Sequence, residues 1–252
     1  RLRPLLPGVS KWRILPALGE VYGGDYCPVK ALEGRQISFS YAGGKTLFSQ
    51  VNVHVKNGEC VILRGPSGSG KTTLCNILAG IIPRSISGEL RGDVLLFGEN
   101  LRTLSLATVV QKVGILFQNP DSQLFFPTVE DEIAFGPENL CLSREEIGLR
   151  IEQALDTVQM GSYRLMETET LSHGQKQRIA LAAVLALQPQ ILILDEAFSQ
   201  LDTGSTHLVK GIIRQQKELG HAIFMVENSE EHLHLVDRVY ELQDGQTREV
   251  VL

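Results

Sequence analysis

The sequence predicts an α/β fold with a mostly parallel sheet, and three observations indicate it. From Gln36 onward, short apolar runs rich in β-branched residues alternate with segments of helical period. The glycine-rich stretch GPSGSGKT lies between one such run and an apolar helical segment. Another apolar run, ILIL, ends in two carboxylates, as expected for a buried strand that reaches the ligand-binding edge of a parallel sheet.

Six short apolar runs are the expected strands. They are Ile37–Tyr41, Val51–Val55, Cys60–Leu63, Val113–Phe117, Ile191–Leu194 and Ala222–Val226. Two helices are expected at Ser143–Met160, with Ser143 and Glu146 as a capping box, and at about Ser205–Leu219, which stops at Gly220. The chain closes with an expected hairpin, Val239–Leu242 and Glu249–Leu252, around the turn Asp244-Gly245.

Composition indicates a soluble globular protein. Of the 252 residues, 43% are hydrophobic and 21% charged, and the net charge of −5 argues against a nucleic-acid-binding face. The four cysteines are scattered, which predicts buried reduced thiols. No apolar run is long enough for a membrane span. Residues 1–34 carry prolines and glycines without a period and are interpreted as a linker or loosely ordered extension, ahead of one domain at 35–252.

The stretch GPSGSGKT fits the phosphate-binding pattern G-x-x-x-x-G-K-[ST] between a strand and a helix. Glycines at 65, 68 and 70 let backbone N–H groups close around phosphate oxygens, and the helix N-terminus adds its positive end. Lys71 is expected to reach the β and γ phosphates, and Thr72 to offer its hydroxyl to Mg²⁺. The strand–loop–helix context disfavours the alternative, a Gly/Ser-rich surface turn. The candidate ATP-binding residues of this loop are Gly65, Pro66, Ser67, Gly68, Ser69, Gly70, Lys71, Thr72 and Thr73.

Asp195 and Glu196 end the apolar strand ILIL. Asp195 suits a Mg²⁺ shell, usually through water, and Glu196 is placed to orient or deprotonate an attacking water, a role typically contributing about 10²- to 10⁴-fold. Either acid alone could cap the next turn, but a phosphate-binding loop upstream favours the catalytic interpretation.

The stretch LSHGQ opens a further helix, with Ser172 and the Gly174 N–H able to meet a phosphate. At this point the chain resembles the nucleotide-binding domain of the ATP-binding-cassette (ABC) family, whose signature is LSGGQ. The resemblance covers about residues 36–252. It implies a P-loop NTPase core with a mostly parallel sheet, an N-terminal antiparallel β part and an α-helical signature subdomain at about 120–180.

The resemblance also implies roles for residues outside these motifs. Tyr41 is expected to stack on adenine, with a core aromatic as the alternative. Gln118 matches the Q-loop glutamine, which touches Mg²⁺ and the water and senses the membrane partner; a solvated loop glutamine is the alternative. The stretch SQLD at 199–202 resembles the D-loop at the dimer interface.

In this family two domains sandwich two ATP molecules. Ser172, Gly174 and Gln175 would therefore serve the nucleotide of a second ABC ATPase domain, in a homodimer, in a heterodimer or fused in one longer chain. His173 replaces the family's first glycine, at a position expected to tolerate it.

The stretch FQNPDSQLFFPTVEDEIAFGPENL is similar to the ATPase subunits of energy-coupling-factor importers of vitamins and cobalt or nickel ions. Within it, residues 124–127 (LFFP) form an apolar cluster, either a groove for a helix of an integral membrane subunit or internal packing of the helical subdomain.

The family normally ends its last core strand in a histidine that contacts the γ-phosphate. Here Glu227 is the expected equivalent, with Asn228 one position away. Two like charges about 4 Å apart repel by roughly 4 kcal/mol at a dielectric near 20. Glu227 should therefore turn away, hold a proton or pair with a cation across the dimer, and this chain's own site is expected to bind ATP well but hydrolyse it slowly.

The predicted function is an ATPase, with ATP and Mg²⁺, that powers a membrane importer from the cytoplasmic, inner face of the cell membrane. The alternatives are a soluble ABC protein acting on nucleic acid or ribosomes and a non-hydrolysing, ATP-dependent interaction module. The acidic balance disfavours the former, and Lys71, Gln118 and Glu196 disfavour the latter.

Overall fold

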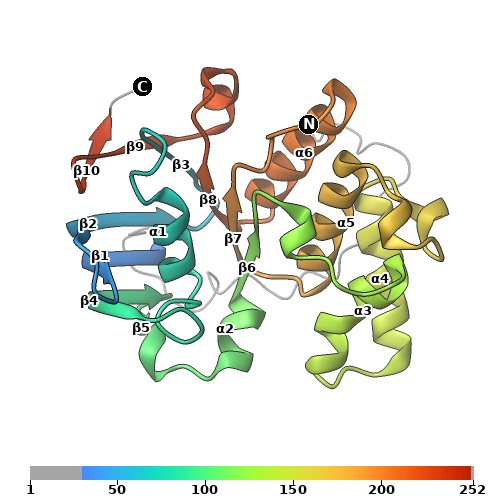
Figure 1. Ribbon diagram of the computed structural model, residues 1–252. Coiled ribbons are helices and arrows are strands. Elements are labelled where there is room, and N and C mark those ends of the chain that lie inside the picture. The colour runs from blue at the N-terminus through green and yellow to red at the C-terminus, as the bar shows by residue number, and fades with distance from the viewer. Residues whose placement is uncertain (1–29, 251–252) are drawn as a thin grey trace, which may run out of the picture.

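The computed structural model describes residues 30–250. They form two β-sheets and a set of helices (Figure 1). The strands are β1 (Lys30–Tyr41), β2 (Thr46–Lys56), β3 (Cys60–Arg64), β4 (Gly88–Leu96), β5 (Glu99–Asn100), β6 (Val113–Leu116), β7 (Ile191–Asp195), β8 (Ala222–Val226), β9 (Arg238–Gln243) and β10 (Gln246–Val250). The α-helices are α1 (Lys71–Leu78), α2 (Leu106–Lys112), α3 (Val129–Asn139), α4 (Arg144–Thr157), α5 (His173–Ala186) and α6 (Thr203–Glu218).

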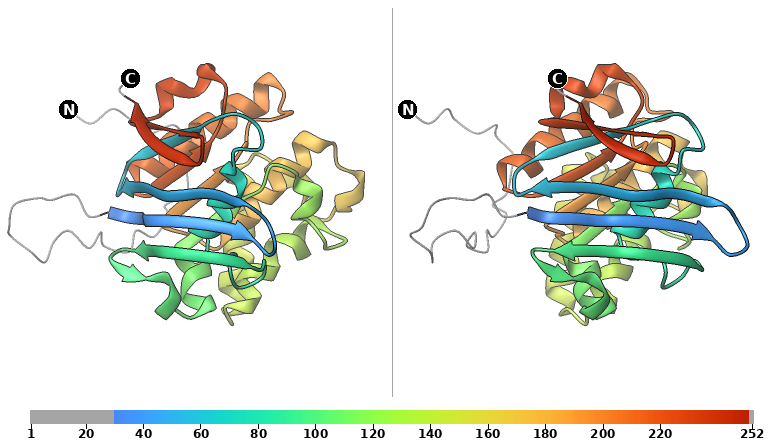
Figure 2. Two further views of the ribbon diagram at one scale, coloured as in Figure 1. Left: turned by 60° about the vertical axis from the view of Figure 1, so that its left-hand side comes forward. Right: turned by 90° about the vertical axis from the view of Figure 1, so that its left-hand side faces the viewer.

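The larger sheet has six strands in the order β10-β9-β3-β8-β7-β6. All neighbours in it are parallel except the terminal hairpin β9–β10. The smaller sheet, β2-β1-β4-β5, is antiparallel, and Figure 2 shows its strands side by side below the hairpin. The α/β class, the mostly parallel sheet and the antiparallel N-terminal part are thus confirmed.

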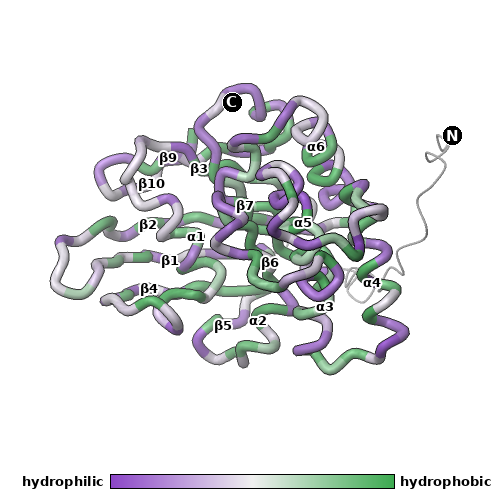
Figure 3. The backbone as a smooth tube through the Cα atoms, turned by 45° about the vertical axis from the view of Figure 1, so that its right-hand side comes forward, coloured by the Kyte–Doolittle hydropathy of each residue, from purple (hydrophilic) through white to green (hydrophobic). Residues whose placement is uncertain are grey.

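Successive side chains of the central strands point alternately to the two faces of the sheet, so the hydrophobic core consists of two clusters, one on each face. Leu192 and Leu194 of β7 face a cluster with α3, α4, α5 and α6, whereas Ile191 and Ile193 face a cluster with α1 and the antiparallel sheet. Successive side chains of a strand point to opposite faces, so a strand buried on both faces must be apolar throughout. Figure 3 shows this hydrophobic centre in the strands around β6 and β7.

The sequence-based elements need several corrections. The strand β2 begins at Thr46, not Val51, and the second strand of the terminal hairpin is Gln246–Val250, not Glu249–Leu252, of which residues 251–252 lie outside the described part. The first strand begins at Lys30, not Ile37, so residues 30–34 of the expected extension belong to β1; residues 1–29 lie outside the described part. The strand β4 was not expected, because its sequence GELRGDVLL is polar for most of its length. At α4, Ser143 accepts from Glu146 N at 3.2 Å, but the Glu146 carboxylate pairs with Arg150 at 2.7 Å instead of closing a capping box.

Two smaller predictions were tested as well. Cys60 and Cys75 are buried as expected, whereas Cys141 is exposed because it follows the end of α3 at the surface; Cys27 lies outside the described residues. Within residues 30–250, none of the helices combines the length and apolar character needed to cross a bilayer.

Candidate functional site

The glycine-rich loop connects the end of β3 to α1, and its backbone has a shape that only glycine allows at two positions. Gly65 has φ +156°, and a Cβ there would lie 2.3 Å from the Leu242 carbonyl oxygen. Gly70 has φ +98° and would bring a Cβ to 2.8 Å from Leu47. The first turn of α1 has no side-chain cap and no acidic residue. Its free N–H groups are therefore available to a phosphate, which fits the predicted role of the loop.

Lys71 is the buried cation of this loop, only 5% exposed. Its Nζ donates to the carbonyl oxygens of Gly65 at 2.8 Å and Pro66 at 3.1 Å, so the ammonium lies over the loop that it follows. Such a group can transfer these hydrogen bonds to phosphate oxygens without moving into a new environment.

Tyr41 stands at the end of β1, next to α1. Its hydroxyl and that of Thr73 lie 2.8 Å apart, and its ring packs edge-on against Phe39. The side chain is 43% exposed, which excludes the alternative of a core aromatic. One ring face thus remains open beside the phosphate loop, and stacking on adenine remains a prediction.

Asp195 ends β7 with 1% of its surface exposed, and its Oδ1 has no hydrogen-bond partner among the described residues. Burial raises the pKa of Asp195, and the neighbouring Glu196 adds to this, while a hydrogen bond from Thr72 and the charge of Lys71 act in the opposite direction. A buried carboxylate oxygen without a donor is costly unless a cation approaches it. Thr72 and Asp195 therefore lie together, as a Mg²⁺ site requires.

Glu196 follows in a left-handed conformation, φ +48°, which is uncommon for a residue with a side chain and is typical of functional sites. Its N–H donates to the Val226 carbonyl at 3.0 Å, and its Oε2 accepts from Gln118 Nε2 at 2.6 Å. The two candidate catalytic residues, far apart in the sequence, thus touch. This contact disfavours the alternative of a merely solvated Gln118.

Glu227 and Asn228 follow β8, between the strands that carry the phosphate loop and Glu196. Glu227 is half-buried, and its Oε1 accepts from the N–H groups of Asn228 at 2.9 Å and Ser229 at 3.3 Å. Burial raises the pKa of Glu227, the charge of Glu196 adds to this, and the two N–H groups lower it. The Glu227 carboxylate therefore points to the backbone of its own loop. Turning away from the phosphate was one of the three arrangements expected for a carboxylate at this position.

The LSHGQ segment begins α5 with a complete capping box. Ser172 Oγ accepts from Gln175 N at 3.3 Å, and Gln175 Oε1 accepts from Ser172 N at 2.9 Å. Gln175 Nε2 also donates to the Tyr163 hydroxyl at 3.1 Å. The Gln175 side chain thus shapes the signature turn from within, while Ser172 is exposed. The predicted roles of Ser172, Gly174 and Gln175 toward a partner's nucleotide remain predictions.

The family model described as ABC transporter matches residues 48–199, more than half of the chain. This chain belongs to the ABC transporter family. The family assignment confirms ATP as the nucleotide. The individual roles of the phosphate loop, Asp195, Glu196 and Gln118 remain predictions.

Relatives of this ABC ATPase domain are found in archaea and bacteria. An ABC transporter ATP-binding protein of Pyrococcus abyssi is 43% identical over 217 residues, which are 85% of this chain and 78% of that protein. The energy-coupling factor transporter ATP-binding protein EcfA1 of Leuconostoc mesenteroides is 38% identical over 221 residues, 86% of this chain and 79% of that protein. A relative in Methanosarcina acetivorans is 42% identical, but the match covers only 34% of it. The chain thus spans about a third of the length of that relative.

Solved structures show the same fold. CbiO1 of Clostridium perfringens, described as part of the ABC transporter complex cbiONQ, superposes with a TM-score of 0.76 at 29% identity, covering 87% of each chain. The ABC cassette MJ0796, solved as a dimer with ADP and Pi, has a TM-score of 0.76 at 24% identity, with 87% of this chain and 97% of that one covered.

Phe125, Phe126 and Phe135 form a partly exposed aromatic patch. Their ring centroids lie 4.9 to 5.2 Å apart, yet Phe125 is 66% and Phe135 41% exposed. Leu124 packs against the helical core. The cluster expected at residues 124–127 is therefore partly internal packing and partly open surface, and its use as a groove for a membrane-subunit helix remains a prediction.

Sequence reasoning missed the residue that builds this patch. Glu132, 5% exposed, accepts from the N–H groups of Phe125 at 2.9 Å and Phe126 at 2.8 Å. Its position four residues after Thr128, the N-cap of α3, could have indicated a carboxylate near a helix N-terminus, but not what it binds.

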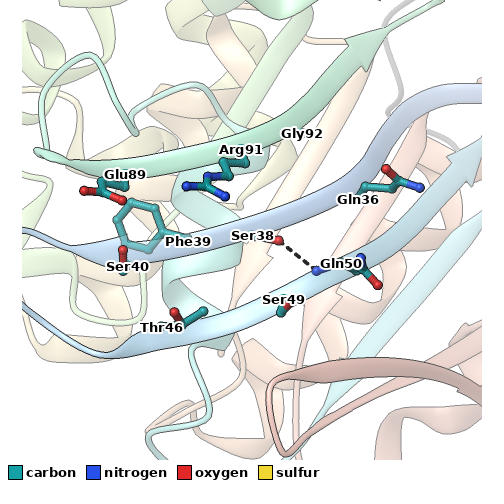
Figure 4. Close-up of a pocket in the computed structure, with 10 residues that line it drawn as sticks. All are labelled: Gln36, Ser38, Phe39, Ser40, Thr46, Ser49, Gln50, Glu89, Arg91 and Gly92. Carbon is teal, nitrogen blue, oxygen red and sulfur yellow. Dashed lines mark hydrogen bonds between the residues drawn. The ribbon is translucent and has the colours of Figure 1, made fainter.

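A hollow of the domain lies apart from the predicted site. A groove of about 450 Å³ lies on the antiparallel sheet, and its polar lining from β1, β2 and β4 includes none of the predicted site residues (Figure 4).

Proposed function

We propose that this chain is the ATP-binding and ATP-hydrolysing part of a membrane importer of the energy-coupling-factor type, which takes up a vitamin or a transition-metal ion. The observation that carries the proposal is that one chain segment both contacts the ATP site and contributes to the aromatic patch. Gln118 contacts Glu196 at the ATP site, and a few residues later the same segment presents the aromatic patch. A change at the γ-phosphate can therefore move a surface that is suited to an apolar helix. The similarity to EcfA1 supports the importer type.

The residues present fit Mg²⁺. Thr72 would supply its hydroxyl, and Asp195 and Gln118 would hold the ion through water, which accounts for the buried Asp195 Oδ1 without a donor. When bound, the ion offsets negative charge on the phosphates. Glu196, held by Gln118 at 2.6 Å, orients the attacking water and accepts its proton.

We expect two such domains to act together, each completing the other's ATP site. The core cluster with α1 and the cluster with α5 lie on opposite faces of the six-stranded sheet, and the two helices lie apart in Figures 1 and 3. The signature at the start of α5 is then free to serve the nucleotide of a second ABC ATPase domain. An integral membrane subunit completes the complex, which places the domain on the inner face of the cell membrane.

ATP hydrolysis is tested with the full-length protein. Lys71→Ala should remove nucleotide binding from this chain's own site. Glu196→Gln should keep binding but lower single-turnover hydrolysis in that site by about 100-fold or more, because it removes the proton acceptor. Full turnover in Glu196→Gln would contradict the role of Glu196. Absence of ATP turnover in the wild type, free and with its membrane partner, would contradict the function.

The docking surface is tested with Phe125→Ser combined with Phe135→Ser. This variant should lose the integral membrane subunit during purification in detergent but keep its basal ATP turnover. Leu106→Ser is the matched control, because Leu106 is 63% exposed but lies on α2, away from the patch. Retention of the membrane subunit by the double variant, or equal loss in the control, would contradict this docking site.

We also propose that hydrolysis in this chain's own site is slow, since β8 ends in Glu227 and Asn228 instead of a histidine. The natural setting is an asymmetric pair in which the second domain carries most of the turnover. A histidine introduced at the end of β8 should raise single-turnover hydrolysis in this site. No gain at either position would contradict the slow-site proposal.

A further inference from the structure

At the exit of β8, Glu227 and Asn228 stand where the family has a histidine, and the structure gives the two side chains different hydrogen-bond partners. In the sheet order β3-β8-β7, β8 lies between the strand that leads into the phosphate loop and the strand that ends in Asp195 and Glu196. The residues that follow β8 therefore emerge between the ends of these two strands.

Asn228 is held in place by three hydrogen bonds. Its N–H donates to Glu227 Oε1 at 2.9 Å, its carbonyl accepts from Arg64 Nη2 at 3.2 Å, and its side-chain Oδ1 accepts from the N–H of Gly65 at 3.4 Å. The contact with Gly65 assigns the orientation of the carboxamide. Among the described residues, the Nδ2 amino group is the polar group of Asn228 that makes no hydrogen bond.

Gly65 is also the residue whose carbonyl accepts from Lys71 Nζ at 2.8 Å. The Asn228 carboxamide and the Lys71 ammonium therefore contact the two ends of the same loop residue. Lys71 is expected to reach the β and γ phosphates, so a donor beside Gly65 lies next to the expected phosphate site. Glu227, in contrast, has its accepting oxygen on the backbone of its own loop.

We propose that Asn228, not Glu227, is the residue of this chain that faces the γ-phosphate, and that its Nδ2 donates a hydrogen bond there while Glu227 positions it. This inference rests on the proposed ATPase function. A carboxamide donates to a phosphate oxygen without adding negative charge, which resolves the repulsion expected for a carboxylate. It cannot take up a proton near neutral pH, which is the physical reason for slow hydrolysis.

The test measures single-turnover ATP hydrolysis in this chain's own site and nucleotide binding, with the full-length protein paired as it purifies. The kcat and KM named below are those of this site. Asn228→Ala should lower kcat about tenfold or more with little change in nucleotide affinity, the effect of losing one donor to the transition state. Asn228→Asp should raise the KM for ATP about tenfold or more, because it places a carboxylate beside the phosphates. Asn228→His should raise kcat at least about threefold and make it depend on pH near 6.5.

Substitutions at Glu227 and Glu230 distinguish the role of Asn228 from that of Glu227. Glu227→Gln keeps an acceptor for the N–H groups and should lower kcat less than Asn228→Ala does; Glu227→His should not raise it. Glu230→Gln, at an exposed carboxylate in the same loop that lies 3.4 Å from Arg64, is the matched control and should leave kcat unchanged. Thermal unfolding with and without nucleotide excludes misfolding as the cause.

A collapse of kcat in Glu227→Gln together with full activity in Asn228→Ala would overturn the inference and return the role to Glu227. If Lys71→Ala abolishes turnover while every Asn228 variant behaves as wild type, the ATPase function stands and this inference fails. If the wild type itself hydrolyses no ATP, the proposed function fails first.

Discussion

At the scale of single residues, Glu132 shows how one buried carboxylate shapes a surface. It lies in the first turn of α3, where the helix N-terminus favours negative charge, and it accepts two N–H groups from the segment that carries Phe125 and Phe126. Without it those N–H groups would be buried without a partner. The exposed aromatic patch therefore depends on a residue that is itself out of contact with solvent.

Glu132→Ala should lower the free energy of unfolding by about 2–4 kcal/mol, since each unsatisfied buried donor costs about 1–3 kcal/mol. Glu145→Ala is the control, because Glu145 also lies in the first turn of a helix but is exposed, and should change stability by less than about 0.5 kcal/mol. Denaturant unfolding measures both. Equal effects would show that the two N–H contacts contribute nothing to stability.

The pH dependence of stability gives a second test of Glu132. Burial raises its pKa above the usual 4.5, although the two N–H groups act in the opposite direction. The folded protein then binds this proton more tightly than the unfolded chain, so the associated stability is complete below pH 4.5 and is lost as the pH rises through the raised pKa. The Glu132→Gln variant has no carboxyl group to titrate at this position and does not lose this stability. The free energy of unfolding of the variant, relative to that of the wild type, should therefore increase between pH 4.5 and 7.

At the scale of elements, the start of α5 makes contacts with the segment after β6 both before and after Gln118. Gln177 Nε2 donates to the Phe117 carbonyl at 3.2 Å, and Lys176 pairs with Asp121 at 2.6 Å. Both contacts come from the first turns of the helix that carries the signature. The strand end that positions Gln118 and the signature that is expected to serve a partner's nucleotide therefore move together.

Lys176→Met should cost less than about 1 kcal/mol of stability, because its partner Asp121 is 55% exposed, yet it should lower ATP turnover about twofold to fivefold. The control is Lys112→Met, whose ion pair with Glu99 has nearly the same exposure, 22% and 58%, but lies away from the site. It should cost the same stability and leave turnover unchanged. Exchanging the charges, Asp121→Lys with Lys176→Asp, should restore part of the activity; equal turnover in both methionine variants would contradict the coupling.

At the scale of the whole molecule, one arginine ties the two sheets together. Arg238 of β9 pairs with Glu59, which precedes β3, at 2.5 Å, and donates to the His54 carbonyl of β2 at 2.7 Å. It also donates to the Tyr240 hydroxyl at 2.9 Å. Arg238 and Glu59 are 16% and 11% exposed, so the pair is largely shielded from water and joins strands far apart in the sequence.

Arg238→Ala should destabilise the domain by about 3–5 kcal/mol, because it leaves the Glu59 carboxylate shielded and unpaired. Arg248→Ala is the control: its guanidinium pairs with Glu241 at 2.8 Å but is 76% exposed, and it should cost less than about 1 kcal/mol. Thermal unfolding separates them, and a small effect at Arg238 would show that the sheets are held by their apolar contacts alone.

Much of the site could be predicted because its chemistry is local. The phosphate loop, the strand that ends in Asp195 and Glu196, and the serine that caps α5 each depend on a few consecutive residues whose spacing sets their geometry. The same holds for the terminal hairpin, which turns at Asp244-Gly245. The strand β4 was beyond such reasoning, because its polar residues are stabilised by pairing with β1 and not by a pattern of their own.

The sequence by itself determined the α/β class, the ABC motifs and the candidate residues of the ATP site. Only the tertiary structure decided which side chain at the end of β8 contacts the phosphate loop, how Glu132 holds the segment that carries the exposed Phe125, and how Arg238 joins the sheets. The physical reason is that periodicity and turn chemistry act over a few residues. The direction of a polar side chain at a strand end depends on donors and acceptors that the fold brings from distant parts of the chain, as the N–H of Gly65 is brought to Asn228.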